Sequence, residues 1–343
     1  MTTAPLLTAL PYHRMAHYTG RHRWWRPLLG TSLLIAGWML LVLFLDTLAY
    51  GVGKAAGYTE LPDGTIDFGP VRGTVLDLAY LAVALPLILV VIRSTGGRPA
   101  GTVSSVIGRL RWLWLTRCAL VAVPAVALLA LAVVFLPGME GGPQDAPDVW
   151  VGWQHFLPAM AVLMLFVPLQ AAAEEYAFRG WLMQAVGGFF RSPWIAVLPQ
   201  AAAFAAAHGW GTQWGFADLL VFGAVAGWLT IRTGGLEAAI ALHALNNLLA
   251  FGLSAAVVDG LSSDDTAADA PWQLAAVDTA LVLVYASIVL WLARRYRPMS
   301  ISPSATLHVE SQMLVPVLAQ APAADVFAAQ PLAGSTESTR TSS

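Results

Sequence analysis

Residues 156–179 read FLPAMAVLMLFVPLQAAAEEYAFR, an apolar run that ends in two adjacent carboxylates. A transmembrane helix needs about 20 mostly apolar residues, and this run comes close to that length. The whole chain has the same character, because 57% of its 343 residues are apolar and only 11% are charged. A soluble domain usually has about 25% charged residues. The composition therefore excludes an ordinary soluble enzyme or a disordered chain and predicts a polytopic membrane protein.

Apolar segments of similar character lie on both sides of this run. The expected fold is all-α, a polytopic membrane helix bundle with about eight transmembrane helices. The fifth and sixth segments are short and rich in small residues, which favours positions inside the bundle. The expected spans are 28–49, 74–92, 115–136, 157–187, 194–209, 216–232, 237–257 and 273–293.

Basic residues are distributed unevenly over the loops. With a cytoplasmic N-terminus and eight spans, the outside segments contain only Lys54 and Arg72 as basic residues, and most loop arginines fall inside. Excess Lys and Arg in short loops marks the cytoplasmic side, so both termini are expected there. The excess of arginine over lysine is typical of a GC-rich bacterial genome. We therefore expect a multi-pass protein of a bacterial cell (plasma) membrane.

The sequence predicts three regions. Residues 1–27 are basic and aromatic, which suits a cytoplasmic segment at the membrane interface. Residues 28–297 form the transmembrane helical domain. Residues 298–343 are rich in Ser, Thr, Ala and Pro and are expected to form a disordered cytoplasmic tail.

The carboxylates at the end of the opening run begin the first polar cluster, Glu174-Glu175-Tyr176-Ala177-Phe178-Arg179. Glu175 and Arg179 are spaced i, i+4 and can pair on one helix face, whereas Glu174 points about 100° away. Two adjacent carboxylates in a low dielectric repel each other, and a carboxylate perturbed in this way is a candidate general acid or base. The alternative is a surface ion pair at the cytoplasmic end of a helix.

Two histidines lie deep in later apolar segments, each with a partner one helical turn away. Phe204 precedes His208 by four residues, and His243 precedes Asn247 by four. Residues at this spacing share a helix face. A histidine on an apolar helix is more often a hydrogen-bonded core residue than a catalytic one, and that alternative remains open.

Taken in order, Glu-Glu-x-x-x-Arg, Phe-x-x-x-His and His-x-x-x-Asn on successive apolar helices resemble the CPBP family. This family is the CAAX prenyl protease and bacteriocin-processing (Abi) group of intramembrane proteases. Each motif alone is common, but the ordered set is specific, and the motif core covers about 165–255. The resemblance implies an all-α membrane peptidase that hydrolyses peptide bonds of membrane-associated substrates.

The resemblance also implies roles for the motif residues. Glu174 matches the carboxylate that activates water, and Glu175 and Arg179 match its neighbours. The remaining motif positions match residues that bind the water, stabilise the oxyanion or hold a metal. They are His208, His243 and Asn247, with Phe204 as a supporting residue.

Two mechanisms remain open at this point. A catalytic zinc ion usually takes three protein ligands and a water, and the candidate ligands are Glu174, His208 and His243. A His-Glu-x-x-His motif is missing from the sequence. In the second mechanism, which we favour slightly, Glu174 deprotonates water while the histidines and Asn247 hold the water and the developing oxyanion.

Two other classes of function are alternatives to an intramembrane endopeptidase. One is a non-proteolytic membrane scaffold or immunity-type protein on the same fold. The other is a proton-coupled transporter with the Glu and His groups as a relay. The sequence lacks the paired inverted halves with interrupted helices that many transporters have. The expected partners are a membrane-associated protein or peptide substrate and the lipid bilayer. Binding of nucleic acid is not expected.

Overall fold

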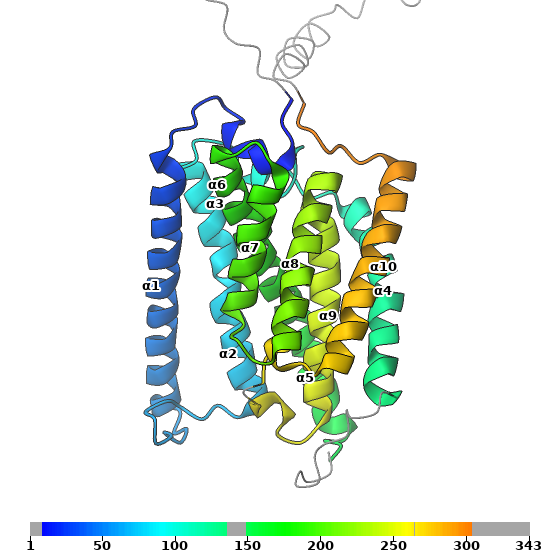
Figure 1. Ribbon diagram of the computed structural model, residues 1–343. Helices are drawn as coiled ribbons and strands as arrows, with labels where there is room; N and C mark the ends of the chain where they lie inside the picture. The colour runs from blue at the N-terminus through cyan, green and yellow to red at the C-terminus, as the bar shows by residue number, and fades with distance from the viewer. Residues whose placement is uncertain (1–8, 136–148, 264, 304–343) are drawn as a thin grey trace, which may run out of the picture. The chain divides into compact units, whose positions relative to one another are not determined.

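The computed structural model describes residues 9–135, 149–263 and 265–303, and they belong to one compact unit. Within these ranges the chain forms helices, turns and isolated β-bridges, with no β-strand (Figure 1). The predicted all-α fold is confirmed. Most of the predicted tail, from residue 304 onward, lies outside the described residues. The boundaries of the three predicted regions and the orientation in the membrane stay predictions.

Seven helical segments among the described residues are long and apolar enough to cross a membrane. Two of these segments contain more than one helix. They are α1 (Trp25–Ala55), α2 (Pro70–Ala82) with α3 (Ala84–Ser94), α4 (Trp112–Phe135), α5 (Trp153–Glu175) with η3 (Tyr176–Leu182) and α6 (Met183–Phe189), α8 (Gln213–Thr233), α9 (Glu237–Ala256) and α10 (Trp272–Tyr296).

The remaining apolar helix, α7 (Pro193–Ala207), corresponds to the expected span 194–209 but has only 15 residues. Its first residue is a proline, which is favoured at the first helical position. It ends before Gly209, which has a φ of 92° that a glycine adopts without strain. Local stop signals therefore make α7 shorter than a typical membrane-crossing helix.

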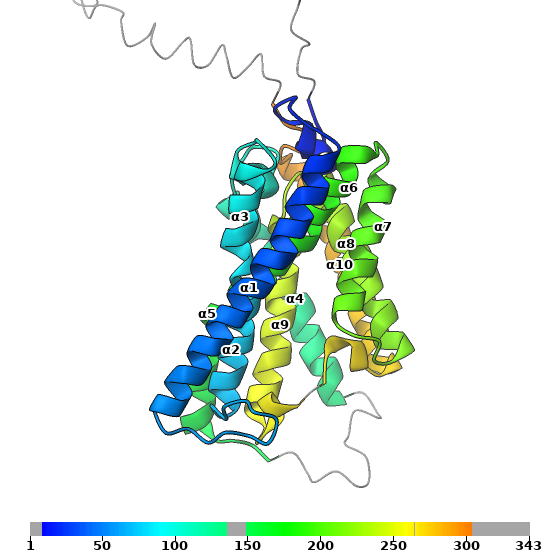
Figure 2. The same cartoon turned by 90° about the vertical axis from the view of Figure 1, so that its left-hand side faces the viewer.

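The helices differ in how much of their surface other helices cover. In α1, only 6% of an apolar stretch of 18 residues is buried inside the protein, compared with 50% of the corresponding stretch in α8. Figure 2 shows α1 running obliquely across one outer face of the bundle. Large apolar side chains such as Leu40 and Phe44 are exposed on α1, as expected of a helix that faces lipid.

The interior of the bundle contains the helices that carry the sequence motifs. Helix α5 packs on α9, and α7 packs on α8. The second contact is close, because a Cβ atom added at Gly223 would lie 2.9 Å from Cα of Ala201. Small residues allow helices in lipid to approach in this way, and they bring α7 and α8 to one side of α9.

The two ends of the described unit meet at one end of the bundle (Figure 1). The Leu10 amide donates to Oγ of Ser302 at 3.0 Å, and the Ser302 amide donates to the Leu10 carbonyl at 2.8 Å. The short helix η1 (Tyr12–His17) lies nearby, with Tyr12 and Met15 fully buried. The segment before α1 is therefore packed into the protein.

Candidate active site

The acidic pair lies where one continuous helical segment changes its hydrogen-bonding pattern. Helix α5 ends at Glu175, and the next seven residues, Tyr176–Leu182, form a π-helix before α6 continues the segment. Such π segments are rare and often occur at functional sites, because they shift the helical register. Glu174 and Glu175 therefore directly precede this irregular segment, and Arg179 lies within it.

Glu175 and Arg179 form an ion pair, with 3.0 Å between Oε1 of Glu175 and Nη1 of Arg179. This pairing confirms the i, i+4 prediction. The alternative of a surface ion pair is wrong, because both side chains have no exposed area. The guanidinium carbon of Arg179 lies 4.0 Å from the ring centroid of Phe204 and 5.6 Å from that of Phe222. Both aromatic rings thus help to bury the cation through their π faces.

His243, on α9, contacts both carboxylates. Its Nδ1 atom lies 2.7 Å from Oε1 of Glu175, and its Nε2 atom lies 3.6 Å from Oε2 of Glu174. Phe204 and Phe222 meet the imidazole edge to face, with ring centroids 5.6 and 5.5 Å from the imidazole centroid. Four helices, α5, α7, α8 and α9, therefore build the surroundings of this histidine.

Gln170 connects Glu174 to Asn247. Nε2 of Gln170 donates to Oε1 of Glu174 at 2.6 Å, and Nδ2 of Asn247 donates to Oε1 of Gln170 at 3.1 Å. The sequence-based prediction missed Gln170, although an amide four residues before Glu174 in an apolar run is a usable signal. It also missed Phe222, for which the apolar sequence of α8 offers no comparable signal.

The two adjacent carboxylates differ in accessibility. The side chain of Glu175 has no exposed area, whereas that of Glu174 is 14% exposed. Oε2 of Glu174 has no hydrogen-bond partner among the described residues. Oε2 of Glu175 also has no hydrogen-bond partner among the described residues, so the two carboxylates are distinguished by the partial exposure of Glu174.

His208 lies at the edge of the cluster, directly after the last residue of α7. Its Nδ1 atom is 2.9 Å from the Phe204 carbonyl oxygen, and its ring centroid is 4.7 Å from that of Phe204. Within the part of the chain that the structure describes, no hydrogen bond or ion pair joins His208 to Glu174 or His243. The structure therefore brings His208 next to Phe204 and leaves it out of contact with the carboxylates.

The candidate zinc ligands Glu174, His208 and His243 do not form a ligand set in this arrangement. Over residues 9–135, 149–263 and 265–303, no three His, Cys, Asp or Glu side chains are grouped so that they could hold a metal ion. Nδ1 of each histidine already faces an oxygen acceptor. The zinc mechanism stays a separate hypothesis.

Comparisons with known proteins agree with the position of these motifs. Residues 153–249 match the family model Rce1-like, described as "Type II CAAX prenyl endopeptidase Rce1-like". The "Uncharacterized protein YyaK" of Bacillus subtilis (strain 168) is 31% identical over 152 residues, which cover 41% of this chain. The chain spans about half the length of that relative, since the match covers 50% of it. No solved structure matches the chain.

The matched segment contains every motif residue from Glu174 to Asn247 and extends over most of the expected core. The resemblance drawn from the three motifs is thereby confirmed. Through its residues 153–249, this multi-pass membrane protein resembles the Rce1-like family.

Proposed function

We propose that this protein is an intramembrane endopeptidase in which Glu174 activates a water molecule for attack on a peptide bond. The observation that carries the proposal is the Oε2 atom of Glu174, which accepts no hydrogen bond, lies 3.6 Å from Nε2 of His243 and belongs to a side chain that is 14% exposed. A general base needs an available lone pair within hydrogen-bond reach of the proton that it removes. Oε2 meets this requirement, because Oε1 already accepts from Gln170.

His243 is suited to orient the same water. The Glu175 carboxylate can only accept a hydrogen bond, so the neutral imidazole carries its proton on Nδ1. Nε2 then has a free lone pair and can accept a hydrogen bond from a water that also contacts Oε2 of Glu174. A buried carboxylate behind a histidine fixes the tautomer and the ring orientation in this way in other hydrolases.

The reaction follows from these positions. Glu174 takes a proton from the water as the water oxygen attacks the carbonyl carbon of the substrate. The tetrahedral intermediate then collapses, the C–N bond breaks, and the proton passes from Glu174 to the leaving amine. Glu175 remains paired with Arg179 throughout and supports His243 without exchanging a proton.

The negative charge that develops on the substrate carbonyl oxygen needs hydrogen-bond donors. Asn247 uses Nδ2 to contact Gln170, and a second N–H of the same amide remains for the oxyanion. His208 holds the Phe204 carbonyl through Nδ1, so it can donate from Nε2 only as an imidazolium. We assign both residues to the oxyanion, with Asn247 as the donor that does not depend on protonation.

The name of the matched family suggests a substrate class. We propose that the substrates are membrane-associated proteins or peptides, and that the enzyme acts in the plasma membrane of a bacterium. Phe204 and Phe222 are buried beside the cluster, whereas Glu174, His208 and Asn247 are partly exposed. We infer that a substrate segment approaches the site from the side of these three residues.

Comparative proteomics of membranes from cells that express the wild type or the Glu174→Gln variant tests the proposal. Newly formed peptide termini should appear with the wild type and be lost with Glu174→Gln, while both proteins insert to equal levels. Glu60→Gln is the matched control, because it removes a carboxylate from an exposed loop ion pair instead. Identical termini with the wild type and Glu174→Gln would exclude Glu174 as the base.

A further inference from the structure

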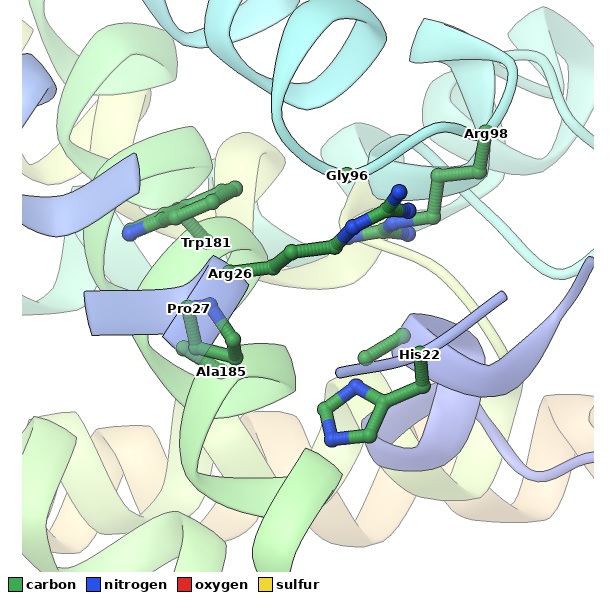
Figure 3. Close-up of a pocket in the computed structure, with 8 residues that line it drawn as sticks. His22, Arg26, Pro27, Gly96, Arg98, Trp181 and Ala185 are labelled. Atoms are coloured by element: carbon green, nitrogen blue, oxygen red, sulfur yellow. The ribbon is translucent and has the colours of Figure 1, made fainter. Parts of the chain in front are cut away.

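A second polar site lies between the segment before α1, the loop after α3 and the helical segment η3–α6. It is a small pocket, open on one side, with a cavity volume of about 20 Å³. Its polar and aromatic walls come from His22, Arg26, Arg98 and Trp181. Figure 3 shows the side chains of Arg26 and Arg98 extending toward each other from opposite sides of the pocket.

Arg98 is a buried cation in this pocket. Only 5% of the residue is exposed, and its Nη1 donates to Oγ1 of Thr102 at 2.7 Å. Burial lowers the pKa of Arg98 to about 10, which leaves the guanidinium charged at neutral pH. The nearest ionisable acid is Tyr12, whose own burial raises its pKa well above the usual value and keeps it neutral. The charge of Arg98 is therefore not compensated by a nearby carboxylate.

Arg26 adds a second guanidinium with free donors. Its Nε and Nη1 atoms are buried and have no hydrogen-bond partner among the described residues. Nη1 approaches the loop after α3 so closely that a Cβ atom on Gly97 would lie 2.7 Å from it. Within the same described ranges, neither Arg26 nor Arg98 forms an ion pair. A buried, unpaired donor on a charged group is destabilising unless a ligand satisfies it.

His22 gives independent information on the sign of the local field. Burial lowers the pKa of His22, and four neighbouring basic groups lower it further. No acidic group opposes them. They are His17, when it is protonated, and the permanently charged Arg14, Arg26 and Arg98. The pocket is thus a region of positive potential from three separate segments of the chain.

We propose that this pocket binds one phosphate-type anion, either the phosphate of an anionic lipid headgroup or free inorganic phosphate. Guanidinium groups match tetrahedral oxyanions because their planar N–H donors form paired, charge-assisted hydrogen bonds. Because the cavity itself has a volume of only about 20 Å³, a single phosphate would bind at its open side, where both guanidinium groups can reach it. The occupant satisfies the free donors of Arg26 and neutralises the charge of Arg98.

The surroundings of the pocket suit a lipid headgroup. Trp24 is 68% exposed and Trp25 is 44% exposed, directly before Arg26 at the start of α1. Exposed tryptophans beside basic residues are typical of the membrane–water interface, and basic pockets between helices at that level bind phosphate headgroups. The pocket also shares a wall with the proposed active site, since Trp181 belongs to the π segment that carries Arg179.

Native mass spectrometry of the full-length protein tests this proposal. Protein released from nanodiscs of phosphatidylcholine with a minority of phosphatidylglycerol should retain one phosphatidylglycerol per chain. The Arg26→Gln variant should retain it about tenfold less, because it loses charged hydrogen bonds to the phosphate. Arg26→Lys should keep part of the binding, since it preserves the charge but not the paired donors.

Arg23→Gln is the matched control, because Arg23 is exposed in the same segment and does not line the pocket. Displacement of the lipid by inorganic phosphate would identify free phosphate as a ligand of the same site, and resistance to displacement would identify the lipid. Equal retention by the wild type and Arg26→Gln, or equal loss with Arg23→Gln, would overturn the proposal. These measurements do not depend on peptidase activity.

Discussion

The Nδ1 atom of His243 lies 2.7 Å from Oε1 of Glu175, although the two residues are 68 positions apart in the chain. This contact separates the two neighbouring glutamates into different environments. Glu175 is fully buried between an arginine and a histidine, whereas the side chain of Glu174 is 14% exposed. The geometry thus favours Glu174 as the reactive carboxylate and Glu175 as the residue that positions His243.

Glu175→Gln should destabilise the protein strongly. The substitution leaves the fully buried Arg179 cation without its partner, and breaking a buried ion pair costs about 3–5 kcal/mol. The free energy of unfolding in detergent micelles measures the loss. The double variant Glu175→Gln/Arg179→Met should lose less than the sum of the two single variants, because it removes both charges.

A control for this experiment is the exposed ion pair of Lys54 and Glu60. Removing Glu60 should change the free energy of unfolding little, because solvent screens an exposed pair. Additive effects of Glu175→Gln and Arg179→Met would show that the two side chains do not interact, contrary to the 3.0 Å contact.

Gln170→Leu should slow peptide hydrolysis without preventing folding. The variant keeps the apolar character of α5 but removes the donor to Oε1 of Glu174 and the acceptor for Asn247. Because Gln170 positions other residues and does not react, we expect about a tenfold fall in kcat with little change in KM. A matched substitution is Gln200→Leu, which removes another buried glutamine that donates to the Gly223 carbonyl outside the cluster. Equal kcat for Gln170→Leu and the wild type would contradict the positioning role.

The segment before α1 should detach more readily at acidic pH. His13 and His17 contact the carbonyl oxygens of Arg191 and Gly188. Burial lowers the pKa of both histidines below the usual 6.5. The two histidines therefore bind protons more readily in the detached segment than in the packed one. The packed state has its full stability above pH 6.5 and loses stability as the pH drops toward the lowered pKa values.

Hydrogen exchange of residues 12–22, expressed as protection factors between about pH 8 and about pH 5.5, measures this effect. His13→Asn/His17→Asn should remove most of the pH dependence, because the amides can still donate to the carbonyls but do not titrate. Protection that stays constant across this range in the wild type would refute the prediction.

Chelation tests the zinc hypothesis directly. In the described residues, Glu174 and His243 lie close together, but the imidazole of His208 contacts Phe204 and neither of them, so the three ligands are not assembled. We expect the purified protein to contain less than one zinc ion per chain and to keep its activity in a chelator. Stoichiometric zinc, loss of cleavage on its removal and recovery on its return would replace the mechanism proposed above.

Local sequence patterns predicted the features that depend on neighbouring residues. Apolar runs of sufficient length gave the membrane helices, and the i, i+4 spacing of Glu175 and Arg179 gave their ion pair. The same rule applied to Gln170 and Glu174 would have found the hydrogen bond between them. The shortness of α7 is also local, because Pro193 and Gly209 limit it.

The π segment Tyr176–Leu182 is a feature that spacing rules did not reveal. A π-helix changes the register of one helical turn without a characteristic composition. The apolar sequences of α5 and α8 likewise do not specify which face meets α9, because helices that are apolar nearly all round can be rotated without changing their pattern.

The sequence by itself therefore determined an all-helical membrane protein, the order of its three motifs and the pairing of Glu175 with Arg179. These features follow from composition and from contacts within one helix. Only the tertiary structure decided that His243 contacts Glu175, that Phe222 covers Arg179 and that Glu174 keeps a free oxygen. Each of these depends on how separate helices pack and rotate against one another, and packing of that kind is set by the fit of whole surfaces and not by spacing along the chain.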